Sequence, residues 1–189
     1  MASVKILRPG YFKMVNEEGC EATCTISLIT DAGKKIIVDT GNVGEGKEIK
    51  KALKKNGLSP SDIDYVIITH YHPDHIGNNS LFENATFVDG VETFVENKFH
   101  FFEEKYTITK NVTVIRTPGH YSNDDCSVIV KTDKGTIAIA GDLFWSDEKN
   151  LPPFIFKKKL LMKSRAKIVK MADFIIPGHG DMFKVSKKK

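Results

Sequence analysis

The sequence lacks long apolar runs and has few cysteines. A helix that crosses a bilayer needs about 20 consecutive apolar residues, and no stretch of this 189-residue chain approaches that length. The first residues, MASVKILRPGYFK, also lack the apolar core of a secretory signal. The three cysteines, Cys20, Cys24 and Cys126, form an odd set that is typical of reduced thiols when no signal is present. We therefore expect a cytoplasmic protein that does not insert into a membrane.

A large excess of one charge is also absent. Lys and Arg together number 28 and Asp and Glu 24, which gives a net charge of +4. This mildly basic balance permits an anionic substrate but does not require one. The lysine-rich stretches GKEIKKALKKNG and FKKKLLMKSRAKIVKM are either solvated helix faces or nucleic-acid-binding surfaces. No arginine-rich or aromatic RNA-binding motif accompanies them, which favours the solvated faces.

Repeats, low-complexity linkers and breaks in composition are absent too, so we expect residues 1–189 to form one domain. Helical periodicity predicts helices over residues 45–56 and 158–171. Strand-like apolar runs occupy much of the remaining chain. Because these runs outnumber the helices, the pattern predicts an α/β fold with two sheets and the helices outside. The runs are TCTISLIT, KKIIVDTG, YVIITH, NATFVDG, NVTVIRTPG, CSVIVKT, GTIAIAGD and DFIIPGHG.

Histidines are concentrated in one segment, THYHPDHIGN, which holds three of the six in the chain. His70 follows the apolar run YVIIT, and residues two apart on extended backbone point the same way. His70 and His72 can therefore converge on one metal ion. Asp74 and His75 come after Pro73 has bent the chain, so they can face a second position nearby.

Three further ligand-type residues follow apolar runs elsewhere in the chain. His120 lies in RTPGH, Asp142 in IAGD and His179 in IIPGHG, each directly after a glycine. Neutral imidazole and carboxylate are standard ligands of borderline and hard divalent metals. A lone histidine at a strand end is usually structural, but this many ligand-type residues in such places predict a metal site.

The order of these motifs resembles the metallo-β-lactamase superfamily of hydrolases, from IIVDTG near Asp39 to the final PGHG. The resemblance implies a four-layer αββα sandwich with a metal site at one edge. It also implies that Asp39 supports the site without binding metal, as a partner for the second ring nitrogen of a ligating histidine. The implied ligands are His70, His72 and His120 for the first ion, Asp74, His75 and His179 for the second, and Asp142 as the bridge between them.

The branch of the superfamily can be narrowed by residue type. The main β-lactamases have a cysteine where this chain has Asp142, and the diiron oxygen-reducing branch has a glutamate where it has His72. A carboxylate at position 142 is the pattern of the glyoxalase II-like and nucleic-acid-cleaving branches. The segments THYHPDHIGNNSLF, TPGHYSNDDCSVIV and SRAKIVKMADFIIPGHGDMFKV are most similar to a glyoxalase II-like branch that is linked to RNA cleavage.

The resemblance thus implies a hydrolase that uses two divalent cations, with zinc favoured over iron or manganese, and a bridging hydroxide. Asp74 could accept the proton of the attacking water. We favour a phosphodiester substrate such as RNA, with a thioester, a lactone or a β-lactam as the alternative. A different class, a mononuclear iron persulfide dioxygenase, uses a similar histidine motif with a single ion, so the number of bound ions separates the two.

The sequence does not decide the roles of several residues near the motifs. Tyr71 is expected to point away from its ligand neighbours, whereas Tyr121 is as consistent with a cleft wall as with packing. Residues 143–156, LFWSDEKNLPPFIF, form either a substrate lid or an apolar plug. Arg165 either contacts a phosphate or packs inside. The natural substrate, the general acid and the oligomeric state, a homodimer included, are not decided by the sequence.

Overall fold

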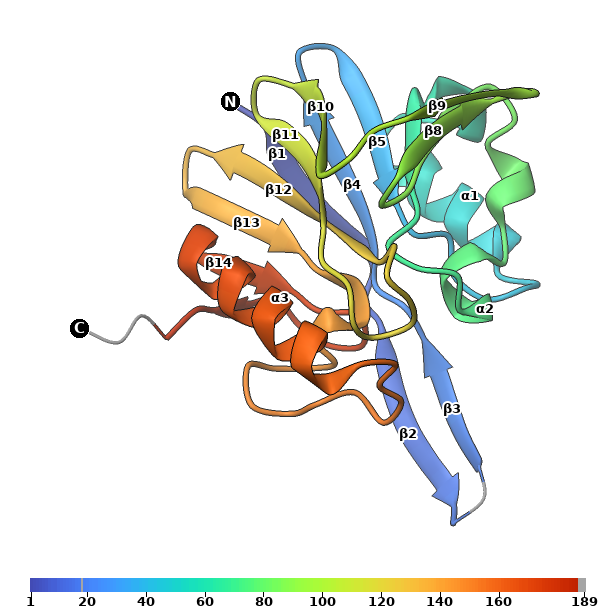
Figure 1. The fold of residues 1–189 in the computed structure, drawn as a ribbon. Helices are drawn as coiled ribbons and strands as arrows, with labels where there is room; N and C mark the ends of the chain where they lie inside the picture. Colours follow the sequence, from blue (N-terminus) through green and yellow to red (C-terminus); the bar gives the residue numbers. More distant parts are fainter. Residues whose placement is uncertain (18, 187–189) are drawn as a thin grey trace.

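The computed structural model describes residues 1–17 and 19–186, and its first sheet contains seven strands (Figure 1). These are β1 (Ser3–Arg8), β4 (Ile26–Asp31), β5 (Lys34–Val38), β6 (Tyr65–Ile67), β7 (Thr86–Val88), β8 (Glu92–Val95) and β9 (Lys98–Phe101). They lie in the order β1-β4-β5-β6-β7-β8-β9. The pairs β5–β6 and β6–β7 are parallel and the other pairs are antiparallel.

The second sheet contains six strands and faces the first (Figure 1). These are β10 (Lys105–Thr109), β11 (Val112–Arg116), β12 (Cys126–Thr132), β13 (Gly135–Ile139), β14 (Phe174–Ile176) and β15 (Phe183–Lys184). They lie in numerical order, and only β13 and β14 pair in parallel.

Alternation of side chains along the central strands builds the layer between the sheets. Ile36 and Val38 of β5 point into the same core as Val128 and Val130 of β12. Ile37 of β5 and Ile129 of β12 point the opposite way, into two separate outer cores. Successive residues of a strand face opposite sides, so these strands are buried on both faces and read as continuous apolar runs.

Two helices cover the outer faces of the sheets. Ile49 and Leu53 of α1 (Gly46–Lys55) pack on the first sheet beside Ile37. Leu161 and Ile168 of α3 (Lys158–Met171) pack on the second sheet beside Ile129. The arrangement is the predicted αββα sandwich. Among the described residues, no helix is long and apolar enough to cross a membrane.

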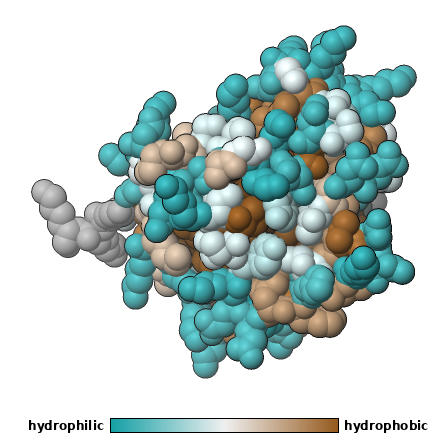
Figure 2. Space-filling view, turned by 90° about the horizontal axis from the view of Figure 1, so that it is seen from above, coloured by the Kyte–Doolittle hydropathy of each residue, from teal (hydrophilic) through white to brown (hydrophobic). Residues whose placement is uncertain are grey.

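A hairpin of β2 (Tyr11–Asn16) and β3 (Gly19–Thr23) projects from the sandwich (Figure 1). The short helices α2 (Pro73–Ile76), η1 (Pro60–Asp62), η2 (Asn79–Leu81) and η3 (Gly141–Leu143) lie in the loops. α2 begins at Pro73, which agrees with the predicted bend between His72 and Asp74. The base of the hairpin and the loops after β5, β6, β11, β13 and β14 meet at one end of the sandwich, where the ligand-type residues gather. Figure 2 shows the molecule from above the opposite end, where hydrophilic residues dominate and apolar ones form small separate spots.

Candidate metal centre

The structure brings all seven predicted ligand residues together in two adjoining clusters. In the first cluster, His70 Nε2 lies 2.9 Å from His72 Nδ1, and His120 Nε2 lies 3.2 Å from the same atom. Asp142 Oδ2 completes this group at 3.3 Å from His120 Nε2 and 3.8 Å from His70 Nε2. All four ligand atoms lie within 4.8 Å of one another, which is the spacing of atoms that share one ion.

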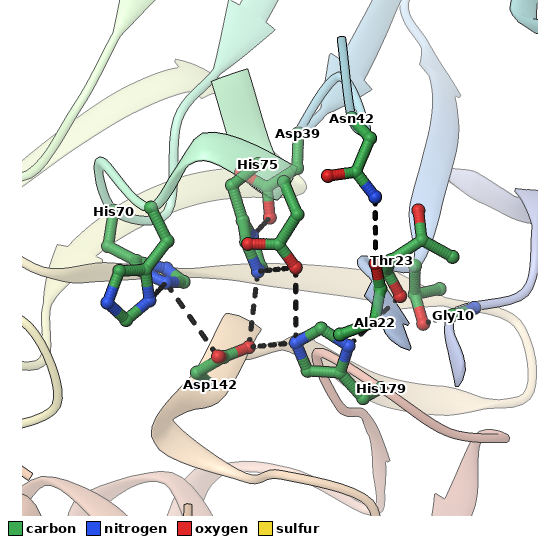
Figure 3. A network of polar contacts seen from close by, with 12 residues as sticks. Gly10, Ala22, Thr23, Asp39, Asn42, His70, His75, Asp142 and His179 are labelled. Carbon is green, nitrogen blue, oxygen red and sulfur yellow. Dashed lines mark hydrogen bonds and ion pairs between the residues drawn. The ribbon is translucent and has the colours of Figure 1, made fainter. Parts of the chain in front are cut away.

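The second cluster uses the other oxygen of the same carboxylate. Asp142 Oδ1 lies 3.3 Å from both His75 Nε2 and His179 Nε2. Asp74 Oδ2 lies 3.5 Å from His179 Nε2 and 3.9 Å from His75 Nε2. Asp142 therefore stands between the two clusters with one oxygen directed at each (Figure 3).

Hydrogen bonds to Asp39 fix the ring nitrogens that face the clusters. Asp39 Oδ2 lies 2.8 Å from His75 Nδ1 and accepts a hydrogen bond from Thr69 Oγ1, also at 2.8 Å. Because the Thr69 hydroxyl donates to Asp39, its oxygen can accept from His70 Nδ1 at 3.1 Å. Protons on these two Nδ1 atoms leave the Nε2 lone pairs of His70 and His75 pointing into the site. The supporting role predicted for Asp39 agrees with these contacts.

His179 is oriented by the base of the β2–β3 hairpin. Its Nδ1 lies 3.0 Å from the carbonyl oxygen of Thr23 and 3.2 Å from that of Tyr11. Both carbonyls can only accept, so the proton sits on Nδ1 and the Nε2 lone pair again faces the cluster (Figure 3). The neighbouring Gly178 carbonyl accepts from Thr25 N at 2.7 Å. The hairpin and the last loop of the chain are thus joined at the site.

Asp125, which no sequence motif singled out, organises the loop that carries His120. One carboxylate oxygen accepts from His120 N at 2.9 Å and from Tyr121 N at 2.8 Å. The other accepts from Ser122 N at 2.8 Å and from Ser122 Oγ at 2.9 Å. The carboxylate is buried and gathers the main-chain N–H groups of a tight turn, which fixes the direction of the His120 ring.

The charges of the clusters suit a cation. Burial raises the pKa of a carboxyl, but His75, His120 and His179 outweigh burial and hold the pKa of Asp142 well below its usual range. Burial and the nearby His75 lower the pKa of His70 well below its usual value, which keeps its ring neutral. Burial lowers the pKa of His75, but Cys24, Asp39 and Asp142 outweigh burial and raise it well above its usual value, so a cation would replace the extra proton of this ring beside Asp142. An ionised carboxylate among imidazoles is a donor set that divalent transition metals bind.

Two buried atoms test whether a cation fits. His75 Nε2 and Asp142 Oδ1 have no hydrogen-bond partner among the described residues although both are inaccessible to solvent. A buried polar atom without a partner costs roughly 1–3 kcal/mol, and a bound cation would satisfy both atoms.

Asp39 and His75 also form a possible group with Cys24. There the Asp39 carboxylate is occupied by hydrogen bonds, and burial raises the pKa of the Cys24 thiol to about 12, so that group is a weaker metal site.

A small cleft of about 180 Å³ opens onto both clusters, with His72, His120 and Asp142 of the first cluster among its lining residues. Its floor includes Asp74 and His179, and its walls come from the hairpin and from residues 143–156. Trp145 lies against His179 with ring centroids 4.1 Å apart and meets Phe12 of β2 edge to face at 5.1 Å. The apolar and thiol-bearing residues of the wall are Phe12, Cys20, Ala22, Trp145, Pro153 and Phe154.

Residues 143–156 divide between the core, as predicted for an apolar plug, and the wall of the cleft. Leu143 and Phe144 are buried in the core beneath α3, whereas Trp145 and Phe154 line the cleft, and Phe154 is 71% exposed. Tyr121 also lines the entrance, with its ring 4.6 Å from that of His72.

Tyr71 and Arg165 turn away from the cleft. The Tyr71 hydroxyl donates to Asp89 Oδ2 at 2.7 Å, as expected for a side chain that points away from its neighbours. Arg165 is buried and donates to main-chain carbonyls, which corresponds to the packing role and not to a phosphate contact.

Comparison with known proteins gives consistent matches. The family model of the metallo-beta-lactamase superfamily matches residues 21–92. The chain is 33% identical over 193 residues to metallo-beta-lactamase domain-containing protein 1 of Xenopus laevis, an alignment that covers 98% of this chain and 82% of that protein. It is 40% identical over 145 residues to a probable metallo-hydrolase of Methanocaldococcus jannaschii, covering 76% of this chain and 70% of that protein.

Solved structures show the same fold. A protein of Thermotoga maritima described as a metallo-beta-lactamase superposes with a TM-score of 0.76 at 22% identity, covering 97% of this chain and 99% of that one. An N-acyl homoserine lactone hydrolase with N-hexanoyl-L-homoserine at its catalytic metal centre superposes with a TM-score of 0.71 at 18% identity, covering 95% and 92%.

Proposed function

The chain belongs to the metallo-beta-lactamase superfamily and is a metallo-hydrolase, and we propose that it works with two divalent cations held by the seven clustered residues. The observation that carries this proposal is the position of Asp142. Its Oδ2 lies in the group of His70, His72 and His120, and its Oδ1 lies beside His75 and His179. A carboxylate shared in this way is suited to hold two ions at a short separation.

The bound ions and the protein would contribute different parts of the chemistry. When bound, two divalent cations activate a water molecule and polarise the oxygen that gains charge. Asp74 and Asp142 both line the cleft, and Asp74 is the more accessible, with a side chain that is 19% exposed against 2% for Asp142. We assign Asp74 the role of accepting a proton from the attacking water. Imidazole and carboxylate ligands favour zinc, with iron or manganese as alternatives.

The cleft favours an ester-type substrate with an apolar group. No lysine or arginine lines it among the described residues, and its wall is mainly aromatic and aliphatic. Apolar groups bind by leaving water, at about 25 cal/mol per Å², whereas the phosphates of RNA on either side of the scissile one would need cationic side chains along the cleft wall. A lactone, a thioester or another carboxylic ester that carries an apolar chain therefore fits the cleft better than RNA does.

RNA or another phosphodiester stays the second candidate because of a basic groove beside α3. This groove of about 540 Å³ is lined by Arg116, which pairs with Asp124 at 2.8 Å, by Lys163, Lys167 and Lys170, and by one acidic residue, Glu104. Four cationic side chains along one groove would attract a polyanion in a salt-dependent manner. The groove lies next to Pro118, two residues before His120, so a bound strand would pass close to the site.

A hydrolysis panel tests these alternatives. Zinc-loaded protein would be assayed with a homologous series of lactones and thioesters, with RNA, with single-stranded DNA and with a β-lactam, alongside the Asp142→Ala variant. We expect turnover of lactones or thioesters that increases with chain length and is absent from the variant. RNA cleavage that weakens steeply with salt, without ester turnover, would favour the second candidate.

Two other expectations remain proposals. A mononuclear iron persulfide dioxygenase would bind one ion, whereas the complete group of Asp74, His75 and His179 supports a second ion. A cytoplasmic location is supported by the three cysteines, which are all unpaired in the structure.

A further inference from the structure

Arg165 is a buried cation that the proposed chemistry leaves without a role. It lies on the inner face of α3 and is 5% exposed. Its guanidinium carbon lies 4.2 Å from the centre of the Phe144 ring. Burying a charge is costly unless hydrogen bonds compensate it, so the contacts of this side chain show what it holds in place.

Those contacts join both ends of one loop. Arg165 Nη1 donates to the carbonyl oxygens of Leu143 at 3.0 Å and of Asn150 at 3.2 Å. Its Nη2 donates to the carbonyl oxygen of Glu148 at 2.5 Å. One planar guanidinium therefore closes residues 143–150 into a fixed turn, which a lysine with a single ammonium group cannot reproduce.

The same loop holds the last ligand of the second cluster. The carbonyl oxygen of Phe144 accepts from Gly178 N at 3.0 Å, and that of Trp145 accepts from His179 N at 2.8 Å. The Trp145 ring also lies against the His179 ring. Gly178 packs so tightly on Asp142 that a Cβ there would stand 1.9 Å from Asp142 Oδ1. A shift of the loop would therefore move His179 relative to Asp142.

We propose that Arg165 is a positioning residue for the second cluster, and that it sets the affinity for the second cation by holding the 143–150 loop against His179. This inference rests on the proposed function, since it presumes that the second cluster binds an ion. The first cluster is supported by other contacts, from Asp125 to the His120 loop and from Thr69 to His70. The first cluster shares only Asp142 with this loop, so loss of Arg165 should weaken the second ion more than the first.

The experiment compares Arg165→Lys and Arg165→Met with Lys159→Met, an exposed position on the same helix. Chelated proteins would be titrated with zinc by calorimetry and followed by native mass spectrometry. Trp145 is the single tryptophan of the chain, so its fluorescence reports the loop directly. We expect the second ion to bind roughly tenfold to a hundredfold more weakly in both arginine variants, as for other residues that support metal ligands. We also expect increased quenching of Trp145 by acrylamide, and Lys159→Met should match the wild type.

The outcomes distinguish failure of the role of Arg165 from failure of the proposed function. Two ions bound with wild-type affinity and unchanged Trp145 quenching in both arginine variants would overturn the role of Arg165. Equal weakening of both ions would also overturn it, because that result indicates a general loss of structure. If Arg165→Met fails to fold by circular dichroism, Arg165→Lys decides the question alone. A wild-type protein that binds fewer than two ions would instead refute the proposed function, and the inference with it.

Discussion

At the scale of single residues, the partners of the histidines decide which nitrogen faces the site. Asp39 receives hydrogen bonds from the Thr69 main chain and hydroxyl and lies 2.8 Å from His75 Nδ1. Its backbone has a φ of +60°, a left-handed conformation that is uncommon outside glycine. Backbone strain of this kind is concentrated at functional sites. A supporting residue thus adopts an unfavourable conformation to hold a ligand.

Asp39→Asn should therefore weaken metal binding without removing a ligand. The amide can offer only one acceptor oxygen where the carboxylate serves both Thr69 and His75. We expect zinc affinity to fall roughly tenfold to a hundredfold, measured by competition with a chromophoric chelator. Asp133→Asn, in the exposed turn between β12 and β13, is the control. Equal affinities for the two variants would contradict the supporting role.

The sequence predicted the seven clustered residues and Asp39, but not Asp125. The ligand-type residues lie in the segments that follow apolar strands, where type and position together indicate a site. Asp125 follows Asp124 in the stretch SNDD, and nothing local distinguishes the two. Asp125 turns inward onto main-chain N–H groups, whereas Asp124 forms a surface ion pair with Arg116. Only the path of the loop in three dimensions decides this.

At the scale of elements, the β2–β3 hairpin is the most informative unit. Phe12 and Ala22 are paired across the two strands and line the cleft. Tyr11 precedes Phe12 on β2, so its side chain points to the opposite face of the hairpin, where it is 48% exposed. The hairpin therefore presents an apolar face to the cleft and a separate face to solvent.

Phe12→Ala should lower kcat/KM for ester substrates with long apolar chains and leave short-chain substrates nearly unchanged. The lost contact area corresponds to roughly 1–2 kcal/mol for a long chain. The measurement is a chain-length series with the variant and with Tyr11→Ala as the matched control. If both variants change long and short substrates equally, the hairpin does not select the substrate.

A second element-scale contact joins the two sheets away from the site. Asp31 at the end of β4 accepts from Thr109 Oγ1 at 2.5 Å and from Asn111 Nδ2 at 3.0 Å. Burial raises the pKa of this carboxyl, but the hydrogen bonds from Thr109 and Asn111 outweigh burial and hold the pKa below its usual value. Because the folded-state pKa is lowered, the stabilisation is present above roughly pH 4 and is lost as the pH falls through the folded-state value.

Asp31→Asn should therefore lower the free energy of unfolding by about 1.5–3 kcal/mol at pH 7, the range for hydrogen bonds to a charged group. The difference from the wild type should shrink at acidic pH. Urea unfolding at pH 7 and at pH 3, with a chelator present at both, would measure this difference and exclude effects of the metal site. A difference that stays constant between pH 7 and pH 3 would show that the Asp31 charge contributes nothing.

The predicted and missed strands differ in burial. β4, β5, β12 and β13 are largely buried and read as apolar runs. No apolar run in the sequence predicted β1 to β3, β8 to β10 or β15. β9 has the sequence KFHF and is exposed at every residue, and β10 has the mixed sequence KYTIT. Edge strands and hairpins of this kind bury one face or none, so their composition carries no clear period. Their pairing is set by neighbouring strands, which the local sequence does not show.

At the scale of the whole molecule, the site connects both sheets. Asp74 and His75 follow β6 of the first sheet, and Asp142 and His179 follow β13 and β14 of the second. The resemblance to the superfamily implied the sandwich and the ligand order, and the ligands lie in the segments that follow strands. The contribution of the hairpin to His179 was not, since Thr23 and Tyr11 act through main-chain carbonyls.

Removal of metal should accordingly lower the melting temperature. An ion that binds only the folded chain stabilises it by mass action, by about 2.7 kcal/mol at a free concentration 100 times the Kd. We expect chelation to lower the melting temperature and to abolish hydrolysis, and added zinc to restore both. Calorimetric scans with and without chelator provide the measurement. An unchanged melting curve after complete removal of metal would show that the site is not coupled to folding.

The central claim is that Asp142 joins two metal positions, and the number of tightly bound ions tests it most directly. Native mass spectrometry of the zinc-loaded protein, with elemental analysis of the same sample, would count the ions per chain. We predict two ions for the wild type and fewer for Asp142→Ala, whose remaining ligands lack the shared carboxylate. A single ion in the fully loaded wild type, or two ions retained at unchanged affinity in Asp142→Ala, would contradict the account.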